Sequence, residues 1–348
     1  MYNSLSLNNF RGFKDFSMDL TPITLISGEN NTGKTTVLES VFFLHDYTNP
    51  DIFLKLLNFR NVRAVNMSPQ AIWEPLFYKM DTERTIKVSM GEKFSLSMER
   101  NYQYALPNSV HKELDKVIGD SSVNYALLLK VIKDGKNFKG DYILGDRIIF
   151  IGHKEKTPPF KTPFVQYLGP NSVPDDMYIA GWLGRVELSG KKHKLIECLR
   201  ILDESITDVM TIVIDGFVQL YIKNNQNIKM PLHVMGDGMR KIVNVALALL
   251  ANPSSILLLD EAENGLHYSL YSKFWALLSS LAKQEKCQII ATTHSYECIS
   301  GALLGVKQVR MNDNFSYTRL DRDNERISPK TFTSEMLKFA LAKDLEVR

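Results

Sequence analysis

The chain has 348 residues, 44% of them hydrophobic and 23% charged, which allows one large domain or two medium ones with a substantial core. With a formal net charge of only +3, the chain has no overall basic surface of the kind that binds nucleic acid, although a local basic patch remains open. Three cysteines, an odd number without metal-binding spacing, argue against a disulfide framework and favour a reduced, cytoplasmic setting. The N-terminus lacks the layout of a signal peptide, and no apolar run approaches the ~18 residues of a membrane helix, so we expect no membrane association.

The first elements predict a strand–loop–helix junction. Residues 3–10 and 13–20 alternate apolar and polar side chains, which is typical of an antiparallel hairpin. The apolar run 22–27 predicts a buried strand that ends at Gly28. Residues 33–47 have helical periodicity, with an inward face made of Val37, Leu38, Val41 and Phe42. The glycine-rich stretch between them therefore connects a strand to a helix.

The middle of the chain, residues 48–235, mixes short strands and helices without a chemical signature. The patterns predict a hairpin near 85–100 with Gly91 at its turn, strands within 124–133 and 141–151, an amphipathic helix over 191–205 and a small meander over 208–234.

The C-terminal part is more regular. Its patterns predict, in order, a tight turn and an apolar helix over 235–253, a buried strand that ends in two acids within 254–267, an amphipathic helix over 268–286, a second buried strand over 287–295, a hairpin over 306–320 with "NDN" at its turn, and a last helix over 331–343.

The stretch from Gly28 to Thr35 matches the P-loop pattern G-x-x-x-x-G-K-[ST]. Backbone N–H groups of such a loop bind phosphate oxygens, and the following helix adds the positive end of its dipole. Lys34 can reach the β- and γ-phosphates, and the Thr35 hydroxyl can ligate Mg²⁺. We expect a side chain at Gly33 to crowd the phosphate. A chance match is disfavoured by the flanking strand and helix.

Two strand ends carry candidate catalytic groups. Asp260 ends an apolar run and is expected to hold Mg²⁺ through water, and Glu261 could polarise the attacking water. His294 ends another apolar run, and parallel strands would place it at the same sheet edge, within reach of the γ-phosphate. The simpler readings are an ordinary acidic strand end and a structural histidine.

Gly236 and Gly238 begin a helix whose N-terminus is bare of side chains, which makes a second anion site. Because one γ-phosphate already has its P-loop, we expect this helix to serve the nucleotide of a neighbouring subunit. The alternative is an ordinary N-cap turn.

These four elements, in this order, resemble the ABC-type ATPases, above all the heads related to SMC, RecF and the OLD (overcoming lysogenization defect) ATPases, including short OLD-like AAA ATPases without a TOPRIM domain found in antiphage defence. The likeness covers residues 1–45 and 233–348 well and is carried by "LSLNNFRGFKDFSMDL", "GENNTGKTT", "MGDGM", "LLLDEAENGLH", "ATTHS" and the final "LEVR". It implies an α/β P-loop NTPase fold of the ABC-ATPase head type, with a mixed sheet and an antiparallel N-terminal hairpin. It also implies one domain over 1–348, with an inserted α+β region, including a helical subdomain, at about 85–230.

The resemblance also assigns roles. It implies ATP and Mg²⁺ as cofactors, Glu261 as general base, Lys34 as the P-loop lysine and His294 as the switch residue, with Thr35 and Asp260 at the metal. Nucleotide contacts are implied for Arg11, Asn30, Asn31, Thr32, Gly33, Lys34, Thr35 and Thr36 in one subunit and for Gly236, Asp237 and Gly238 of its partner, with Asn264 and Gly265 at the dimer seam.

Three features depart from the pattern of that group. Gly236 stands where the signature serine usually lies, so only backbone N–H groups remain there. No glutamine lid is identifiable, since Gln70 has no supporting context. The 226 residues from Lys34 to Asp260 (260 − 34) contain no heptads, which excludes SMC-like arms.

The resemblance implies an ATP-hydrolysing homodimeric switch that controls or scaffolds a separate effector, such as a nuclease or toxin, in antiphage defence. The alternative is a DNA-binding repair ATPase of the RecF or SMC type. For it, the cluster of Lys191, Lys192, His193 and Lys194 could touch phosphates, although a solvated helix start is the favoured explanation of the cluster. A transporter motor and a non-hydrolysing scaffold are disfavoured by the "NNFRGF" opening and by Glu261. Asp321 and Asp323 lie in a polar turn, so we expect no nuclease activity in this chain.

Overall fold

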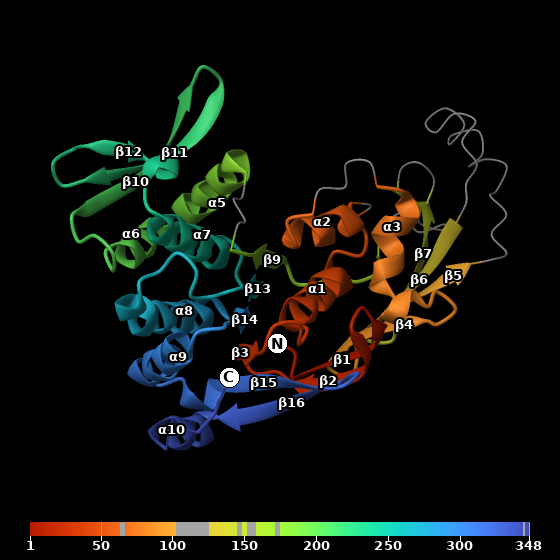
Figure 1. The fold of residues 1–348 in the computed structure, drawn as a ribbon. Helices are drawn as coiled ribbons and strands as arrows, with labels where there is room; N and C mark the ends of the chain where they lie inside the picture. Colours follow the sequence, from red (N-terminus) through yellow and green to blue (C-terminus); the bar gives the residue numbers. More distant parts are fainter. Residues whose placement is uncertain are drawn as a thin grey trace.

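The computed structural model describes residues 1–49, 51–62, 67–101, 125–144, 148–151, 158–170, 175–343 and 345–347. These residues form a six-stranded sheet, a seven-stranded sheet and a small three-stranded sheet, with helices packed around the first (Figure 1). The mixed α/β architecture expected from the sequence is confirmed.

The six-stranded sheet contains the strands that carry the candidate site. Its order is β16 (Arg326–Thr333), β15 (Phe315–Asp323), β3 (Ile23–Gly28), β14 (Gln288–Thr292), β13 (Ile256–Leu259) and β9 (Val165–Leu168). The strands from β15 to β9 are parallel, and only β16 is antiparallel to its neighbour. β3, β13 and β14 are buried along their whole length, as expected where both faces of a parallel sheet are covered.

The two faces of this sheet belong to two hydrophobic cores. Because strand side chains alternate between faces, Leu25 packs in one core and Ile26 in the other, and Leu257 and Leu258 divide in the same way. One face is covered by α1 (Lys34–His45) and α2 (Ile52–Phe59), followed by α3 (Pro69–Trp73), η1 (Glu74–Leu76) and η2 (Tyr78–Met80). These elements pack on the sheet in the core that contains Ile26 and Leu258.

The opposite face is covered by α7 (Asp237–Ala251), α8 (Tyr271–Glu285) and α9 (Tyr296–Gln308). α5 (Asp176–Leu188) and α6 (Lys192–Leu199) pack on α7, and α10 (Ser334–Ala342) packs on β15 and β16. Short 3₁₀ helices precede three of these elements: η3 (Leu232–Val234), η4 (Tyr268–Leu270) and η5 (Asn312–Asn314).

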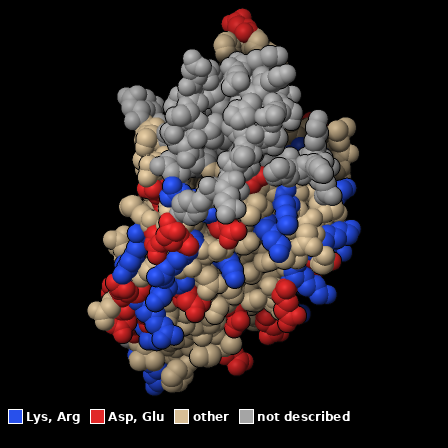
Figure 2. Space-filling model, turned by 90° about the vertical axis from the view of Figure 1, so that its right-hand side faces the viewer, with Lys and Arg blue, Asp and Glu red and all other residues tan. Residues whose placement is uncertain are grey.

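The predicted N-terminal hairpin is the edge of the seven-stranded sheet, which is antiparallel throughout. Its order is β2 (Phe13–Asp19), β1 (Ser4–Phe10), β4 (Ile86–Met90), β5 (Phe94–Asn101), β6 (Tyr125–Lys133), β7 (Lys136–Leu144) and β8 (Ile148–Ile151). On the face of the molecule drawn in Figure 2, acidic and basic side chains of the described residues are intermixed, so no patch of a single sign forms there.

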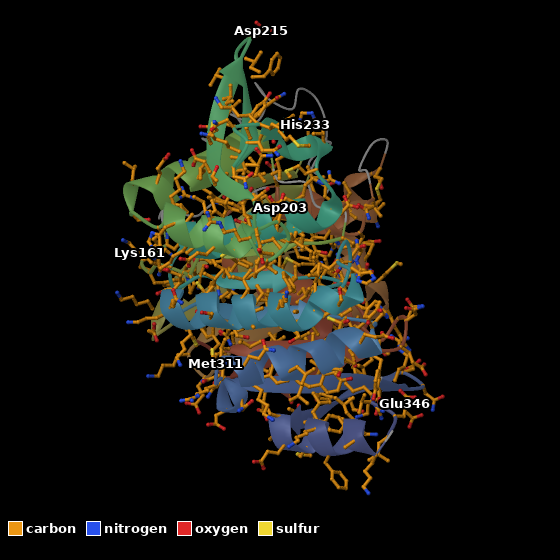
Figure 3. The ribbon with its side chains drawn as sticks, turned by 90° about the vertical axis from the view of Figure 1, so that its left-hand side faces the viewer. Lys161, Asp203, Asp215, His233, Met311 and Glu346 are labelled. Atoms are coloured by element: carbon orange, nitrogen blue, oxygen red, sulfur yellow. The ribbon has the colours of Figure 1, made fainter. Side chains whose placement is uncertain are left out.

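The third sheet projects from the helical side of the molecule and consists of β10 (Ile206–Ile214), β11 (Phe217–Asn224) and β12 (Lys229–Pro231). Asp215 marks the outer end of its hairpin (Figure 3). Residues 85–230 therefore contribute to all three sheets, and their treatment as one inserted α+β region within a single domain stays an interpretation.

The hairpin expected over residues 306–320 is wrong. α9 continues to Gln308, "NDN" forms η5, and the hairpin is β15–β16 with its turn at Asn324, whose φ is 53°. The short run "VKQV" fits both the helical and the strand period, so it did not specify a strand. The Asp-Asn of "RDNE" is a stronger turn signal than "NDN". The helix expected over 191–205 is also shorter, because it ends at Leu199.

None of the helices in the described part of the chain is both long and apolar enough to cross a membrane. Cys198, Cys287 and Cys298 are all buried and free.

Candidate nucleotide site

The predicted loop lies between β3 and α1 and contains two glycines in conformations that side chains disfavour. Gly28 has φ 140°, and a Cβ there would lie 2.5 Å from the Leu320 carbonyl of β15. Gly33 has φ 92° and caps α1, and its Cβ would lie 2.6 Å from the ring of Phe13. The protein itself therefore requires both glycines, in addition to any phosphate that approaches Gly33.

Gly33→Ala is expected to lower the free energy of unfolding by at least ~1–2 kcal/mol, the usual cost of a left-handed residue with a Cβ. Phe13 would also have to move. Chemical denaturation measures the loss, and Gly236→Ala is the matched control. Gly236 has an ordinary φ of −60°, and no atom lies within 4 Å of the position that a Cβ would take there, so its replacement should leave stability unchanged. Equal stability of the two variants would contradict the described loop conformation.

Lys34 lies beneath the loop with its ammonium among backbone carbonyls. Its Nζ donates to Gly28 O at 2.7 Å and to Glu29 O at 2.8 Å, and the side chain is buried. Burial lowers the pKa of Lys34 to about 8, and the nearby Asp260, Glu261 and Glu263 partly oppose that effect. A positive charge thus stands at the point where the loop N–H groups would meet an anion.

Thr35 and Asp260 meet across the junction of α1 and β13. The Thr35 hydroxyl donates to Asp260 Oδ2 at 3.0 Å, and the Tyr167 hydroxyl donates to the same oxygen at 2.9 Å. Thr292 donates to Oδ1. A hydroxyl and a carboxylate side by side are hard oxygen ligands of the kind Mg²⁺ takes, with phosphate and water completing its shell. The donor set therefore fits Mg²⁺, and among the described residues no cluster of three or more His, Cys, Asp or Glu suggests another metal.

Glu261 follows Asp260 in an unusual backbone conformation. Its φ is 49°, and its N–H donates to Thr292 Oγ1 at 2.9 Å. Burial raises the pKa of Glu261, and the charges of Asp260 and Glu263 add to the effect. His294 lies at the same edge, where its N–H donates to Glu263 Oε1 at 2.7 Å. Glu261 thus directly follows the Asp260 that binds Thr35, and its carboxyl group has a raised pKa.

A cavity of about 570 Å³ lies against the loop. It contains most of the predicted contacts together with three further basic residues, Arg60, Lys79 and Arg322. Its polar lining comprises Arg11, Asn30, Asn31, Lys34, Thr35, Thr36, Arg60, Lys79, His294 and Arg322. Thr32 is the exception, since its hydroxyl is turned to Glu29 O at 2.9 Å within the loop. The cavity matches an anionic ligand in both position and charge.

Two of the cations in this cavity are fixed by one buried carboxylate that the sequence analysis missed. Glu39 of α1 is fully buried, and its two oxygens accept from Arg60 Nε at 2.6 Å and Nη2 at 2.8 Å. Arg11 Nε forms an ion pair with Glu39 Oε2 at 2.9 Å. Glu39 falls outside the inward face predicted from Val37, Leu38, Val41 and Phe42, so no local pattern marked it as buried. It is buried because α1 is covered on almost every side, and a buried carboxylate needs cationic partners.

The N-terminus of α7 is not part of this cavity. Gly236, Asp237 and Gly238 do not line it, whereas Asp237 lines a separate cavity of about 380 Å³ with Lys241, Asn264 and Gly265. A Cβ on Gly238 would lie 3.1 Å from Gly265 O, so α7 packs closely on the loop after β13. Within one subunit, the structure does not bring these glycines to Lys34.

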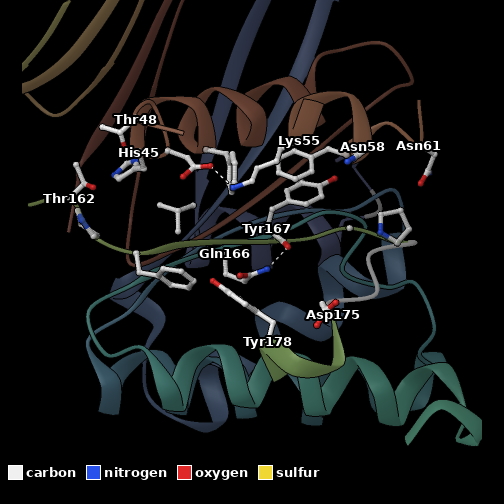
Figure 4. Close-up of a pocket in the computed structure, with 18 residues that line it drawn as sticks. His45, Thr48, Lys55, Asn58, Asn61, Thr162, Gln166, Tyr167, Asp175 and Tyr178 are labelled. Atoms are coloured by element: carbon white, nitrogen blue, oxygen red, sulfur yellow. Dashed lines mark hydrogen bonds and ion pairs between the residues drawn. The ribbon is translucent and has the colours of Figure 1, made fainter. Parts of the chain in front are cut away.

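Tyr167 is a second residue that the sequence analysis missed. Its hydroxyl binds Asp260, while its ring stacks on Phe59 with centroids 3.6 Å apart. The ring borders a cavity of about 980 Å³ between the α1–α2 side and α5, where Figure 4 shows it with Lys55, Asn58 and Tyr178. β9, which carries Tyr167, is a four-residue strand flanked by prolines and gave no clear strand signal.

Three weaker candidates have ordinary partners. Gln70 lies on α3, donates to Glu74 and does not line the cavity at the loop. Asp321 is paired with Arg319 at 2.7 Å and with Lys330 at 2.8 Å. The basic cluster is neutralised by acids: Lys191 and Lys194 face Glu285, and Lys192 faces Glu187 and Asp208.

Comparisons with known proteins agree with this geometry. Residues 1–129 match a family described as "AAA ATPase domain", and residues 187–300 match one described as "AAA domain, putative AbiEii toxin, Type IV TA system". An "ATP/GTP phosphatase" of Helicobacter pylori is 24% identical over 97% of both chains. The crystal structure of an SMC head bound to the C-winged helix domain of ScpA is 12% identical, covers 98% of this chain and 99% of its own, and has a TM-score of 0.51. The chain therefore has the ABC-type, SMC-head fold of P-loop ATPases.

Proposed function

We propose that the protein is an Mg²⁺-dependent ATPase that closes as a homodimer around two ATP molecules and controls a separate effector protein. The observation that carries this proposal is the meeting of Thr35 and Asp260 at 3.0 Å beside a loop that holds Lys34 beneath it. A P-loop lysine, a hydroxyl and a strand-end carboxylate at one point are the parts that phosphoryl transfer requires.

Each residue has a distinct part in this chemistry. The loop N–H groups and Lys34 bind the β- and γ-phosphates, and Thr35 and Asp260 would hold Mg²⁺, which neutralises phosphate charge when bound. Tyr167 and Thr292 orient the Asp260 carboxylate. Glu261, whose pKa is raised by burial, would accept the proton of the attacking water, and His294, which lines the cavity at the loop, would contact the γ-phosphate.

Dimer formation would supply the second half of the site. Gly236 has open space where a side chain would project and an ordinary backbone conformation, so nothing in the single subunit requires glycine there. Close approach of an external group explains a glycine at that helix N-terminus. Two-fold symmetry would then place each Gly236–Gly238 turn on the nucleotide of the other subunit, with Asn264 and Gly265 at the seam.

The effector is proposed from the family likeness. One matching family is named for the AbiEii toxin of a type IV toxin–antitoxin system, which favours a role in antiphage defence. Hydrolysis would remove the γ-phosphate contact and loosen the dimer seam, as in other nucleotide switches. The opening of the dimer would then be transmitted to the effector. The RecF-like DNA-binding alternative is not favoured, because the 191–194 cluster is paired with acids.

Phosphate release from ATP tests the activity directly. We expect turnover with Mg²⁺ and its loss when EDTA removes the metal. Light scattering in parallel should show a particle of doubled mass with ATP under conditions of slow turnover. A pure protein that releases no phosphate at any Mg²⁺ concentration would contradict the proposal.

A further inference from the structure

One lysine connects α7 to the loop that carries Glu261. Lys241 lies one turn after Gly236, and its Nζ donates to Glu261 O at 3.1 Å and to Asn264 O at 2.7 Å. It lies in the cavity at the α7 N-terminus and not in the cavity at the P-loop, so it does not contact the nucleotide proposed there. Lys241 therefore acts on the backbone of the loop and not on the reacting atoms.

The loop needs such a tether because Glu261 is held in a left-handed conformation, with φ 49°, which is unfavourable for a residue with a side chain. On the sheet side, Glu261 N–H and Ala262 N–H both donate to Thr292. On the helix side, Glu261 O accepts from Asn264 N–H at 3.0 Å and from Lys241. The orientation of Glu261 is thus fixed from β14 on one side and from α7 on the other.

The environment of Lys241 is costly for a cation. Desolvation lowers the pKa of Lys241 to about 8. The face of the Phe274 ring, whose centroid lies 5.9 Å from the ammonium, attracts it and offsets part of that cost. Removal of this desolvated donor would leave the Glu261 and Asn264 carbonyls without the hydrogen bond that Lys241 donates to each. Removal of a solvated surface lysine would have no such effect.

We propose that Lys241 is a positioning residue that couples the Gly236–Gly238 turn of α7 to Glu261, so that docking of a second subunit on this turn sets the placement of the base. This inference rests on the proposed function. The coupling path is short, since Lys241 lies three residues after Gly238 on the same face of α7, and Gly238 packs on the loop at Gly265 as well. Binding in trans would thereby reach Glu261 through one helix and one side chain.

The test compares Lys241→Met, which keeps the stem and loses the donors, with Lys241→Arg, which keeps both charge and donors. Lys191→Met is the matched control, because Lys191 contacts the other end of α7 at Leu250 O (3.4 Å) and pairs with the buried Glu285. Two readouts are needed: hydrogen exchange of amides 260–266 without nucleotide, and kcat and KM for ATP.

We expect Lys241→Met to speed exchange of this loop and to lower kcat about 10- to 100-fold with KM unchanged, since misplacing a catalytic group costs rate and not binding. Lys241→Arg should recover most of kcat, and Lys191→Met should change neither readout. Wild-type exchange and kcat in Lys241→Met would overturn the inference, as would an equal loss of kcat in Lys191→Met. If the wild-type protein hydrolyses no ATP, the proposed function fails, while the exchange arm still decides whether Lys241 holds the loop.

Discussion

Lys34→Ala is expected to weaken ATP binding by about 150- to 5000-fold, which corresponds to the ~3–5 kcal/mol typical of removing one partner of a buried ion pair. The buried ammonium sits between the Gly28 and Glu29 carbonyls, and no other cation contacts those two oxygens among the described residues. Titration with a fluorescent ATP analogue measures the affinity.

The same variant should remain folded, because the charged form of Lys34 is already disfavoured by burial, as its lowered pKa of about 8 indicates. Lys55→Ala is the control, since it removes an ion pair to Asp46 at 2.7 Å on the neighbouring helix, outside the cavity at the P-loop. Retention of wild-type affinity by Lys34→Ala would contradict the P-loop assignment.

Glu261→Gln is expected to lower kcat by about 10²- to 10⁴-fold, the usual contribution of a general base, and to leave ATP affinity unchanged. The substitution keeps the size of the side chain and removes its ability to accept a proton. Because hydrolysis would no longer open the seam, the closed dimer should accumulate with ATP and Mg²⁺. Steady-state kinetics and light scattering measure both effects, and Glu335→Gln, at an exposed position on α10, serves as the control.

The pH profile gives an independent check on Glu261. Its pKa is raised, so protonation should inactivate the base at a higher pH than for an ordinary glutamate. The acid limb of wild-type kcat should therefore be displaced upward, and the residual activity of Glu261→Gln should lack that limb. Full turnover of Glu261→Gln would remove Glu261 as the base.

The sequence predicted the parts of the site that are local in the chain. The P-loop, the strand that ends at Asp260 and the strand that ends at His294 each have a signal within about ten residues, because glycine spacing and apolar runs are local patterns. The hairpin 3–20 was equally clear, since strict alternation specifies which face is buried.

The missed parts depend on contacts between distant segments. Glu39 meets Arg60 from 21 residues away, Lys241 meets Glu261 from 20, and Tyr167 meets Asp260 from 93. Each contact depends on how separate elements pack, namely α1 on α2, α7 on the loop after β13, and β9 beside β13. A pattern along the chain does not contain that packing. The error in the hairpin expected near Asn312 has a local cause. The short apolar segments on either side of "NDN" fit the helical period and the strand period equally well.

A mixture of two inactive variants shows whether Gly236 of a second subunit completes the site at Lys34. Gly236→Glu places bulk and negative charge where the partner's phosphate would lie, in space that is open within one subunit, so it should keep ATP binding and lose hydrolysis. Lys34→Ala should also lose hydrolysis, because it removes the lysine beneath the P-loop.

In a mixed dimer, the intact Lys34 of the Gly236→Glu subunit faces the intact Gly236 of the Lys34→Ala subunit. We expect an equal mixture to recover about a quarter of wild-type turnover, since half of randomly formed two-fold dimers are mixed and each has one intact site of two. Turnover by Gly236→Glu alone, or no recovery in the mixture, would contradict this expectation.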